Sequence, residues 1–537
     1  MRQLLLLLLG SLWFTSQSMA QTKYWIFFTD KDTTAYDYRL HLTEEAIEKR
    51  TLQEIPLLQY TDIPLKEKYI ESIKKQQIKP VVRSKWLNAI SVVMTEADKQ
   101  KLDSLPFIRQ IIPIYDRIKI LSFKDSVEYY TALEQMEAYR FQQEKLNGDG
   151  IIVGVIDAGY VGASQNEYLE HLFEEKRILG LRDLVNPQRT EHFKFSETSS
   201  DNHGNTVLQM ITGYEKGGMQ YGFATKSRFY LARTDHGDRE FRGEEDYWVA
   251  AMEWMDSLGV RIINTSLGYA LGFDNPQENY KPEQMDGKTS VISKAAQIAA
   301  GEKGLLIVVS AGNEGNDANW GIISTPADTK GVLSVGANTF QYLKAGYSSI
   351  GAEFLDYLKP NIVCYASGGT SFSAPVLTGF AACMMQKNPK ATNKQIIAYI
   401  EKSGHLYPHG NNYMGYGIPK ASRILTLMNG EKEQNNTKIE QAKGVYVFKN
   451  KTSNTIKAQL FHKKNATIVI EQEMRNFGQG ENRIDKPNKA TQSTLVLPDE
   501  VIEIFWDKTS AKVVKKAQRK AKRQAKKEAK QEAKKNK

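Results

Sequence analysis

Four polar residues in this chain could together carry out nucleophilic hydrolysis. Ser371 could act as the nucleophile, but a serine hydroxyl is a poor nucleophile at its free pKa and needs a base beside it. His203 could be that base, and Asp157 could accept a hydrogen bond from the second ring nitrogen. The side-chain amide of Asn313 could donate to an oxygen on which negative charge develops. The sequence therefore points to acyl transfer, provided that the fold brings these side chains together.

Ser371 lies in the stretch Gly368-Gly369-Thr370-Ser371-Phe372-Ser373-Ala374-Pro375, which predicts a tight turn followed by a helix. The glycines allow the turn, and Pro375 is expected in the first helical turn, where its missing N–H costs little. The helix continues along an apolar side made of Val376, Leu377, Phe380, Ala381 and Met384. The alternative interpretation is that Thr370 or Ser371 is merely a helix N-cap.

His203 occupies the expected start of a helix over residues 203–211, after Asp201-Asn202. The apolar residues at i+4, i+7 and i+8 predict a buried helix face that fixes the histidine at the helix start. Because the positive end of a helix disfavours an imidazolium, we expect His203 to stay neutral enough to act as a base. Taken singly, His203 could be a solvated histidine, Asp157 a turn residue and Asn313 a loop residue.

Apolar runs at 151–156, 229–232, 260–264, 305–309 and 332–335 are typical of strands covered on both faces. Helical stretches at 203–211, 244–257 and 289–302 separate them. This alternation predicts an α/β domain with a mostly parallel sheet and helices on both faces. Asp157, Ser266 and Asn313 follow the ends of such runs, so they should converge at the carboxyl edge of the sheet.

The rest of the chain divides by composition. Residues 21–117 read as a small α+β unit, and residues 443–507 as a small β module of short alternating runs. Arg2, the apolar run that follows it and Ser18-Met19-Ala20 predict a signal peptide cleaved after residue 20. The predicted organisation is signal peptide 1–20, α+β unit 21–117, partly helical connector 118–147, catalytic domain 148–427, linker 428–442, β module 443–507 and Lys-rich tail 508–537.

The charge of the chain is concentrated in its tail. Residues 508–537 hold 14 Lys and Arg against 2 Glu, a net charge of +12, whereas the whole chain carries +10. The body is therefore close to neutral and shows no nucleic-acid signature. The two cysteines, Cys364 and Cys383, are expected to be buried thiols, although export would permit a disulfide between them.

The order and local sequence of the four polar residues resemble the subtilisin-like serine proteases, the subtilase or peptidase S8 family. The resemblance runs from about residue 148 to residue 422, and its motifs include Val-Ile-Asp-Ala-Gly and Gly-Thr-Ser-Phe-Ser-Ala-Pro. It implies that Asp157, His203 and Ser371 are catalytic and that Asn313 is the oxyanion donor.

The same resemblance implies where substrate binds. Ser266, Leu267 and Gly268 correspond to the strand that pairs with substrate and borders the primary specificity pocket. Ser310, Ala311 and Gly312 correspond to the opposite wall of that pocket. Residues 21–117 are similar to the inhibitory prosegment that such enzymes carry and remove.

Two features depart from the family pattern. The usual His-Gly-Thr is His203-Gly204-Asn205, with Thr206 one place later. The segment between 359–363 and Ser371 is also shorter than in relatives, which bears on the shape of the pocket. The chemistry requires no cofactor, and the sequence specifies neither metal ligands nor structural calcium sites.

We therefore expect an exported serine endopeptidase, made as an autoprocessed precursor and located in the periplasm, the cell envelope or outside the cell. Its expected partners are protein or peptide substrates and its own prosegment, with no nucleic acid, and the tail could contact anionic envelope surfaces. One alternative is a catalytically inactive relative that serves as an envelope binding protein, which the four intact polar residues argue against. Another is a lipase or esterase, which would require a Gly-x-Ser-x-Gly elbow that Ser371 lacks.

Overall fold

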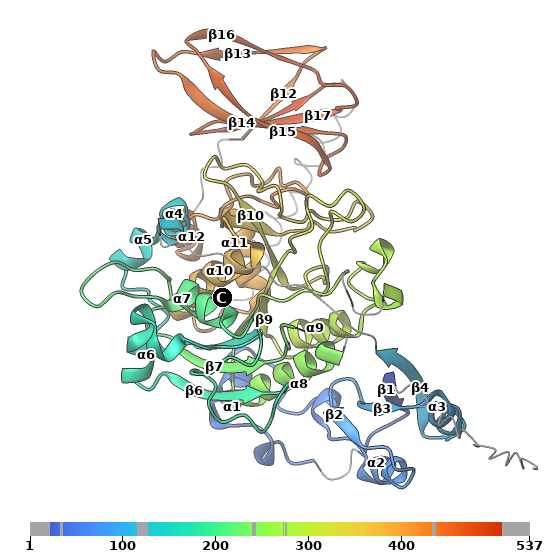
Figure 1. The fold of residues 1–537 in the computed structure, drawn as a ribbon. Helices are drawn as coiled ribbons and strands as arrows, with labels where there is room; N and C mark the ends of the chain where they lie inside the picture. Colours follow the sequence, from blue (N-terminus) through green and yellow to red (C-terminus); the bar gives the residue numbers. More distant parts are fainter. Residues whose placement is uncertain are drawn as a thin grey trace, which may run out of the picture.

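The computed structural model describes residues 22–506 except 33–35, 115–126, 239–242, 272, 274–275 and 432–436. The predicted signal peptide and Lys-rich tail lie outside the described residues. An α/β body lies at the centre of the molecule, with an N-terminal unit on one side and a β module at the far end (Figure 1). No helix within the described ranges has the length and apolar character needed to cross a membrane.

The central body is built on a seven-stranded sheet in the order β11-β10-β9-β8-β5-β7-β6. Every pair of neighbouring strands in it runs parallel, where the sequence predicted a mostly parallel sheet. The strands are β5 (Ile152–Asp157), β6 (Ile178–Asp183), β7 (Arg228–Arg233), β8 (Ile262–Thr265), β9 (Leu306–Ser310), β10 (Leu333–Asn338) and β11 (Ile362–Tyr365). The outer strands β6 and β11 were not predicted, because β6 contains polar residues and β11 is only four residues long.

Helices cover both faces of this sheet. Alternate residues of β5 divide between two apolar clusters, Val153 and Val155 on one face and Ile152 and Ile156 on the other. The first cluster includes α7 (His203–Thr212), α10 (Thr370–Lys387), α11 (Asn393–Ser403) and α12 (Ala421–Met428). The second includes α8 (Gly243–Ser257) and α9 (Val291–Gly301). The predicted α/β architecture is confirmed.

The N-terminal unit is an antiparallel sheet in the order β2-β3-β1-β4 with three α-helices, which confirms the predicted α+β unit. Its elements are β1 (Thr22–Phe28), α1 (Glu44–Leu52), α2 (Glu67–Lys74), β2 (Pro80–Ser84), β3 (Ala89–Met94), α3 (Glu96–Asp103) and β4 (Ile108–Ile114). Trp25 and Phe27 of β1 pack into the cluster that contains α8, while Ile26 and Phe28 face the unit's own core. One face of this small sheet therefore rests on the central body.

A set of five buried charges, here called the buried charge cluster, also joins the N-terminal unit to the body. Its members are Lys49, Arg50 and Asp62 from the unit and Asp256 and Lys303 from the body. Asp256 contacts Lys49 at 2.7 Å and Arg50 at 3.1 Å, and Asp62 contacts Arg50 at 2.7 Å and Lys303 at 2.8 Å.

The described part of the predicted connector is helical and packs into the body. It forms α4 (Val127–Gln135) and α5 (Ala138–Gln143), while residues 118–126 lie outside the described residues. Leu133, Met136 and Phe141 belong to the same apolar cluster as α7 and α10. This segment is therefore a covering layer of the central body.

The C-terminal module is confirmed as all-β. It contains a five-stranded sheet in the order β12-β18-β17-β14-β15 and a separate β13-β16 pair. The strands are β12 (Thr437–Gln441), β13 (Val445–Asn450), β14 (Ile456–Lys463), β15 (Val469–Phe477), β16 (Gly480–Asp485), β17 (Gln492–Val496) and β18 (Val501–Phe505). The prediction of a linker over 428–442 is wrong for residues 437–441, which form β12 and pair in parallel with β18.

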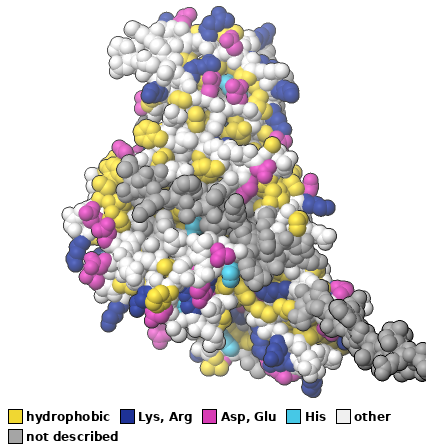
Figure 2. All heavy atoms as spheres, viewed as in Figure 1, with side chains coloured by type: hydrophobic (Ala, Val, Ile, Leu, Met, Phe, Trp, Pro, Cys, Tyr) yellow, Lys and Arg dark blue, Asp and Glu magenta, His cyan; other side chains and the backbone are white. Residues whose placement is uncertain are grey.

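Charged side chains of both signs are interspersed on the face of the molecule drawn in Figure 2. The module packs on the body through Phe461, Val469, Val496 and Val501, which join the cluster that contains α10.

Candidate active site

Asp157 and His203 meet in a buried hydrogen bond. The Nδ1 atom of His203 lies 2.6 Å from Oδ1 of Asp157, and neither residue is more than 3% exposed. Asp157 is the last residue of β5, and His203 is the first residue of α7. The same Asp157 oxygen accepts a 2.9 Å hydrogen bond from the backbone N–H of Ala158. The carboxylate is therefore held from two sides and orients the imidazole.

Two glycines allow the loop after β5 to lie against the start of α7. The N–H of Gly204 donates to the carbonyl of Gly159 at 2.8 Å, and the N–H of Val161 donates to the carbonyl of Asp201 at 2.8 Å. A Cβ at Gly204 would lie 2.5 Å from the Gly159 carbonyl oxygen, and one at Gly159 would lie 2.7 Å from the backbone of Asp201. The close approach that brings His203 to Asp157 therefore requires glycine at both positions.

The expectation that the helix terminus keeps His203 neutral is wrong in its direction. Burial lowers the pKa of His203, but the Asp157 carboxylate outweighs burial, and the net effect is a pKa raised above the ordinary value. The opposing cause is the Asp157 carboxylate, which acts through its charge and through the 2.6 Å hydrogen bond. The imidazole is consequently a stronger base than an isolated histidine.

Ser371 is the second residue of α10 and is 9% exposed. Its hydroxyl donates to the carbonyl of Ser266 at 3.1 Å, and the Ser266 hydroxyl donates to the carbonyl of Ser371 at 2.8 Å. The ring of the next residue, Phe372, lies 5.6 Å from the imidazole of His203, so the starts of α10 and α7 are neighbours. The Nε2 atom of His203 is buried and has no hydrogen-bond partner among the described residues, so it can accept a proton.

Pro375 lies one turn deeper than predicted. It is the sixth residue of α10, so the helix lacks the N–H that would bond the carbonyl of Ser371 four residues earlier. That carbonyl is satisfied by the hydroxyl of Ser266. Because Pro375 has no N–H, the Ser371 carbonyl is bonded by a residue that follows β8 instead of by the helix itself.

The side chain of Asn313 is oriented by Thr370. Its Oδ1 accepts hydrogen bonds from the backbone N–H of Thr370 at 2.8 Å and from the Thr370 hydroxyl at 3.1 Å. Because an N–H must meet the amide oxygen, Nδ2 is the atom left as a donor. A Cβ at Gly369, where φ is +147°, would lie 3.5 Å from Nδ2. The donor therefore borders the turn that precedes Ser371.

The six residues assigned to substrate binding lie on two neighbouring strand ends. Ser266, Leu267 and Gly268 follow β8, while Ser310 ends β9 and is followed by Ala311 and Gly312. The structure thus brings all ten candidate site residues to the carboxyl edge of the sheet and the helix starts beside it.

The sequence did not point to two further residues at this edge. Ser324 donates from its N–H to the carbonyl of Ala311 at 3.2 Å, and a Cβ at Gly268 would lie 2.2 Å from its hydroxyl. It therefore borders both candidate walls. Asp235 follows β7, accepts a 3.2 Å hydrogen bond from the Tyr269 hydroxyl, and has a pKa raised to about 7 by burial and by the charge of Asp157. Neither lies in a recognisable motif, so only the fold could reveal them.

No group of three or more His, Cys, Asp or Glu side chains that could hold a metal ion occurs in the described part of the chain. Cys364 and Cys383 are separate, buried free thiols. The short segment noted before Ser371 consists of β11, which ends at Tyr365, and four residues before α10.

With this geometry established, comparison with known proteins shows the class to which the chain belongs. Residues 148–417 match the Peptidase_S8 model of the subtilase family, and residues 23–131 match the model of the peptidase S8 propeptide domain of Bacteroidota. The chain belongs to the subtilase family. It is a subtilisin-like serine endopeptidase with an N-terminal propeptide domain.

Individual relatives are distant. Subtilisin NAT of Bacillus subtilis subsp. natto is 23% identical over 343 residues, covering 62% of this chain and 80% of the relative. Subtilisin of Bacillus pumilus is 24% identical over 302 residues, covering 55% of this chain and 96% of the relative. Among solved structures, the epidermin leader peptide processing serine protease of Staphylococcus aureus has a TM-score of 0.51 and 15% identity, covering 77% of this chain and all of that one. This structural likeness supports the fold.

Proposed function

We propose that the chain is an exported serine endopeptidase that hydrolyses peptide bonds through Asp157, His203 and Ser371 and matures by processing itself. The observation that carries the proposal is the 2.6 Å contact between Asp157 and His203. It leaves the buried Nε2 of His203 without a partner among the described residues, on a ring 5.6 Å from that of Phe372 in the first turn of α10. A base oriented by a carboxylate beside a serine is the arrangement that nucleophilic catalysis requires.

Catalysis begins with a change of hydrogen-bond partner. The Ser371 hydroxyl, which donates to the Ser266 carbonyl at 3.1 Å, turns to His203 when substrate enters. His203 takes the hydroxyl proton as Ser371 attacks the substrate carbonyl, and Asp157 stabilises the imidazolium. His203 then protonates the leaving amine, and a water molecule hydrolyses the acyl-enzyme by the same steps.

Two donors stabilise the oxyanion in this proposal. Nδ2 of Asn313 is oriented by the bonds of its oxygen to Thr370, and the backbone N–H of Ser371 lies in the first turn of α10, where a helix has no internal acceptor. The substrate backbone would lie along Ser266, Leu267 and Gly268, with its primary side chain between them and the segment Ser310, Ala311 and Gly312. No step requires a cofactor.

The N-terminal unit serves as inhibitor and is removed after the chain has folded. It is anchored to α8, where Glu253 accepts hydrogen bonds from the backbone N–H groups of Lys85 and Trp86, each at 3.1 Å. In a full-length Ser371→Ala chain, we expect the precursor to persist uncut. A fully matured Ser371→Ala product would show that another protease removes the unit.

The direct test of the chemistry is labelling with a fluorophosphonate probe, which reacts with activated serines. We expect the wild-type chain to be labelled and to cleave peptides, and Ser371→Ala to lose both properties while it remains folded. A wild-type chain that is neither labelled nor active would favour the alternative of an inactive envelope binding protein. Cleavage of esters but not peptides would favour a lipase or esterase.

The location proposal combines the predicted signal peptide with the Lys-rich tail. The tail's net charge of +12 would be attracted to anionic envelope surfaces, by about 1 kcal/mol for each Lys or Arg close to an anionic membrane. We expect the full chain, but not a chain ending at residue 507, to sediment with anionic vesicles at low salt and to be released at high salt. Equal sedimentation of the two chains, or no effect of salt, would refute the tether.

A further inference from the structure

Arg233 is a buried residue that contacts the segments on either side of the Asp157–His203 pair. It is the last residue of β7, 2% exposed, and its Cα is paired with that of Asp157 on β5 and with that of Asp183 on β6. Its backbone position alone therefore places it beside the carboxylate that orients His203.

The guanidinium group joins the loop after Asp157 to the turn before His203. Its Nε donates to the carbonyl of Ala158, the residue after Asp157, at 2.9 Å. Its Nη2 donates to Oδ1 of Asp201, two residues before His203, at 3.0 Å. One rigid group thus fixes the separation between the two segments whose side chains meet at 2.6 Å.

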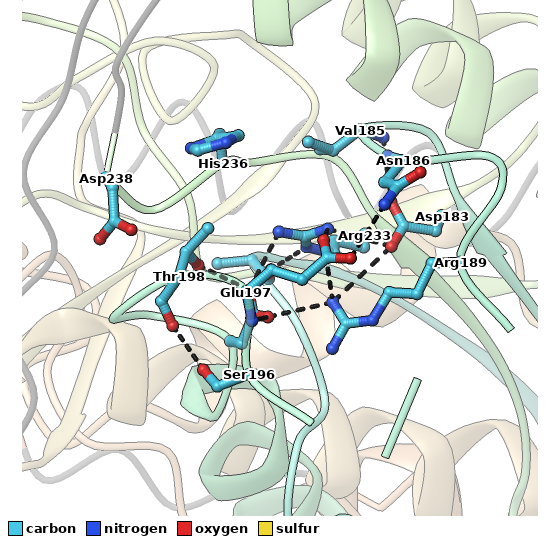
Figure 3. Close-up of polar contacts among 12 residues, drawn as sticks. Asp183, Val185, Asn186, Arg189, Ser196, Glu197, Thr198, Arg233, His236 and Asp238 are labelled. Atoms are coloured by element: carbon cyan, nitrogen blue, oxygen red, sulfur yellow. Dashed lines mark hydrogen bonds and ion pairs between the residues drawn. The ribbon is translucent and has the colours of Figure 1, made fainter. Parts of the chain in front are cut away.

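A second layer of contacts holds the guanidinium itself. Nη1 of Arg233 donates to Asp183 at 3.0 Å and to Glu197 at 2.9 Å. Figure 3 shows the side chains of Arg233 and Arg189 converging on these carboxylates. Arg189 also donates to Oδ2 of Asp201 at 3.0 Å.

Both carboxylate oxygens of Asp201 accept hydrogen bonds within this arrangement. Besides the two arginines, its carboxylate accepts hydrogen bonds from the hydroxyl of Thr198 at 2.6 Å and from the N–H of Glu197 at 2.7 Å. Burial opposes its charged form, but these hydrogen bonds and the arginines hold the pKa of Asp201 below its ordinary value. The carboxylate is therefore a charged anchor for Arg233 at neutral pH.

We infer that Arg233 is a positioning residue of the active site, which holds the Asp157 and His203 segments at the separation needed for their hydrogen bond. Its effect on turnover rests on the proposed function, whereas its effect on the geometry does not. Arginine suits this role because its planar fork presents donors in fixed directions to a carbonyl and several carboxylates at once, whereas lysine offers a single ammonium on a flexible stem.

The test replaces Arg233 by lysine, which keeps the charge and removes the fork. The matched control is Arg177→Lys. Arg177 is also buried, at 7% exposed, donates to the carbonyl of Ser227 at 2.9 Å and pairs with Glu175 at 3.3 Å. Arg177 precedes β6, whereas Asp183 ends that strand. The control residue therefore lies at the amino end of the strand, away from the carboxyl end that carries the candidate active site.

The first readout does not depend on catalysis. In the full-length Ser371→Ala chain, the Nδ1 proton of His203 should give a far-downfield proton NMR signal, identified by its absence in a Ser371→Ala, His203→Gln chain. We expect this signal to move upfield or disappear with Arg233→Lys and to be unchanged with Arg177→Lys. An unchanged signal in both variants would overturn the inference.

The second readout is kinetic and uses the matured enzyme. We expect Arg233→Lys to lower kcat about 10- to 100-fold with little change in KM, because misplacing reacting groups by about 1 Å costs up to about 10²-fold. The acid limb of kcat/KM should also move to lower pH as the contact with Asp157 loosens. Asp235, the other carboxyl that raises the pKa of His203, still has a cation at position 233 in the lysine variant. A loss of activity no larger than that of Arg177→Lys at equal melting temperature would refute the role. A changed NMR signal in a chain without any peptidase activity would instead refute the proposed function and retain the positioning.

Discussion

Ser266 and Ser371 exchange hydrogen bonds, each hydroxyl donating to the carbonyl of the other residue, at 2.8 Å from Ser266 and 3.1 Å from Ser371. Ser266 follows β8, and Ser371 lies in the first turn of α10. The pair ties the strand end proposed to bind substrate to the residue proposed to attack it. The reason for this link is Pro375, which cannot supply the helical hydrogen bond to the Ser371 carbonyl.

The first prediction concerns this link. Ser266→Ala should lower the free energy of unfolding by about 1–3 kcal/mol, because it leaves the buried Ser371 carbonyl without a donor. Denaturant unfolding of the full-length chain in the Ser371→Ala background measures the change. Adding Pro375→Ala should recover part of the loss, because the new N–H can bond that carbonyl within the helix. A double variant no more stable than Ser266→Ala would contradict this explanation.

The second prediction concerns the oxyanion donor. Asn313→Ala should reduce kcat by about 10²–10³, the range known for loss of this type of donor in subtilisin, with a smaller change in KM. Asn313→Asp is the matched variant, because it retains an oxygen for the hydrogen bonds from Thr370 but has no side-chain N–H. We expect Asp at least as deleterious as Ala, since its charge repels the oxyanion. Full activity in the Asp variant would exclude the assigned role.

The third prediction concerns pH. His203 must be unprotonated to act as the base. Burial lowers the pKa of His203, but Asp157 raises it by more, so the net pKa lies above that of an ordinary histidine. We therefore expect kcat/KM to fall as the pH decreases through this raised pKa. The stabilisation from the same pair should be complete below the pKa of unfolded histidine and be lost as pH rises through the folded pKa. Asp157→Asn should shift the acid limb to lower pH and cost about 10⁴ in kcat.

Asp235 supplies the control for that profile. Its own pKa of about 7, raised by burial and by Asp157, places its titration near the same range. If His203 governs the acid limb, Asp235→Asn should leave a limb that still responds to Asp157→Asn. Disappearance of the limb in Asp235→Asn would assign it to Asp235 instead.

The fourth prediction concerns the buried charge cluster. The described partners of the Asp256 carboxylate are Lys49 and Arg50 of the N-terminal unit, which hold its pKa below the ordinary value although burial opposes the charge. Asp256→Asn should therefore weaken the hold of the cleaved unit and shorten the delay between processing and full activity several-fold. High salt should change the delay little in the wild-type chain, because buried pairs are poorly screened. The control is Glu353→Gln, which breaks an exposed pair with Lys464 far from the unit; an equal delay in Asp256→Asn and wild type would contradict the prediction.

Much of the fold follows from local patterns in the sequence. The long apolar runs predicted the inner strands, and Thr43, Thr95 and Ser290 act as N-caps where helices begin. The motifs around Asp157, His203, Asn313 and Ser371 predicted which side chains the sheet edge would gather. The sequence did not predict the short or polar strands β6, β11 and β12, because pairing with neighbouring strands stabilises them more than their own composition does.

The sequence did not reveal the residues that support the site, for a different reason. Arg233, Asp235 and Ser324 acquire their partners across neighbouring strands and loops, up to 75 residues away in the case of the Arg233 contact with Ala158. Nothing in their local sequence distinguishes them from surface residues. The same holds for Pro375, whose effect depends on a hydroxyl 105 residues distant from the Ser371 carbonyl.

The parallel pairing of β12 with β18 has a mechanical consequence. The five residue pairs from Thr437↔Val501 to Gln441↔Phe505 join the strand that enters the C-terminal module to the strand that leaves it. If the Lys-rich tail is held at a surface while the enzyme pulls on a bulky substrate, the load acts on these two strands in opposite directions along their length. All of the pairs then resist in shear at the same time, instead of opening one after another. Under such a load, the β12–β18 pairs would act together with the apolar contacts that Phe461, Val469, Val496 and Val501 make with the body.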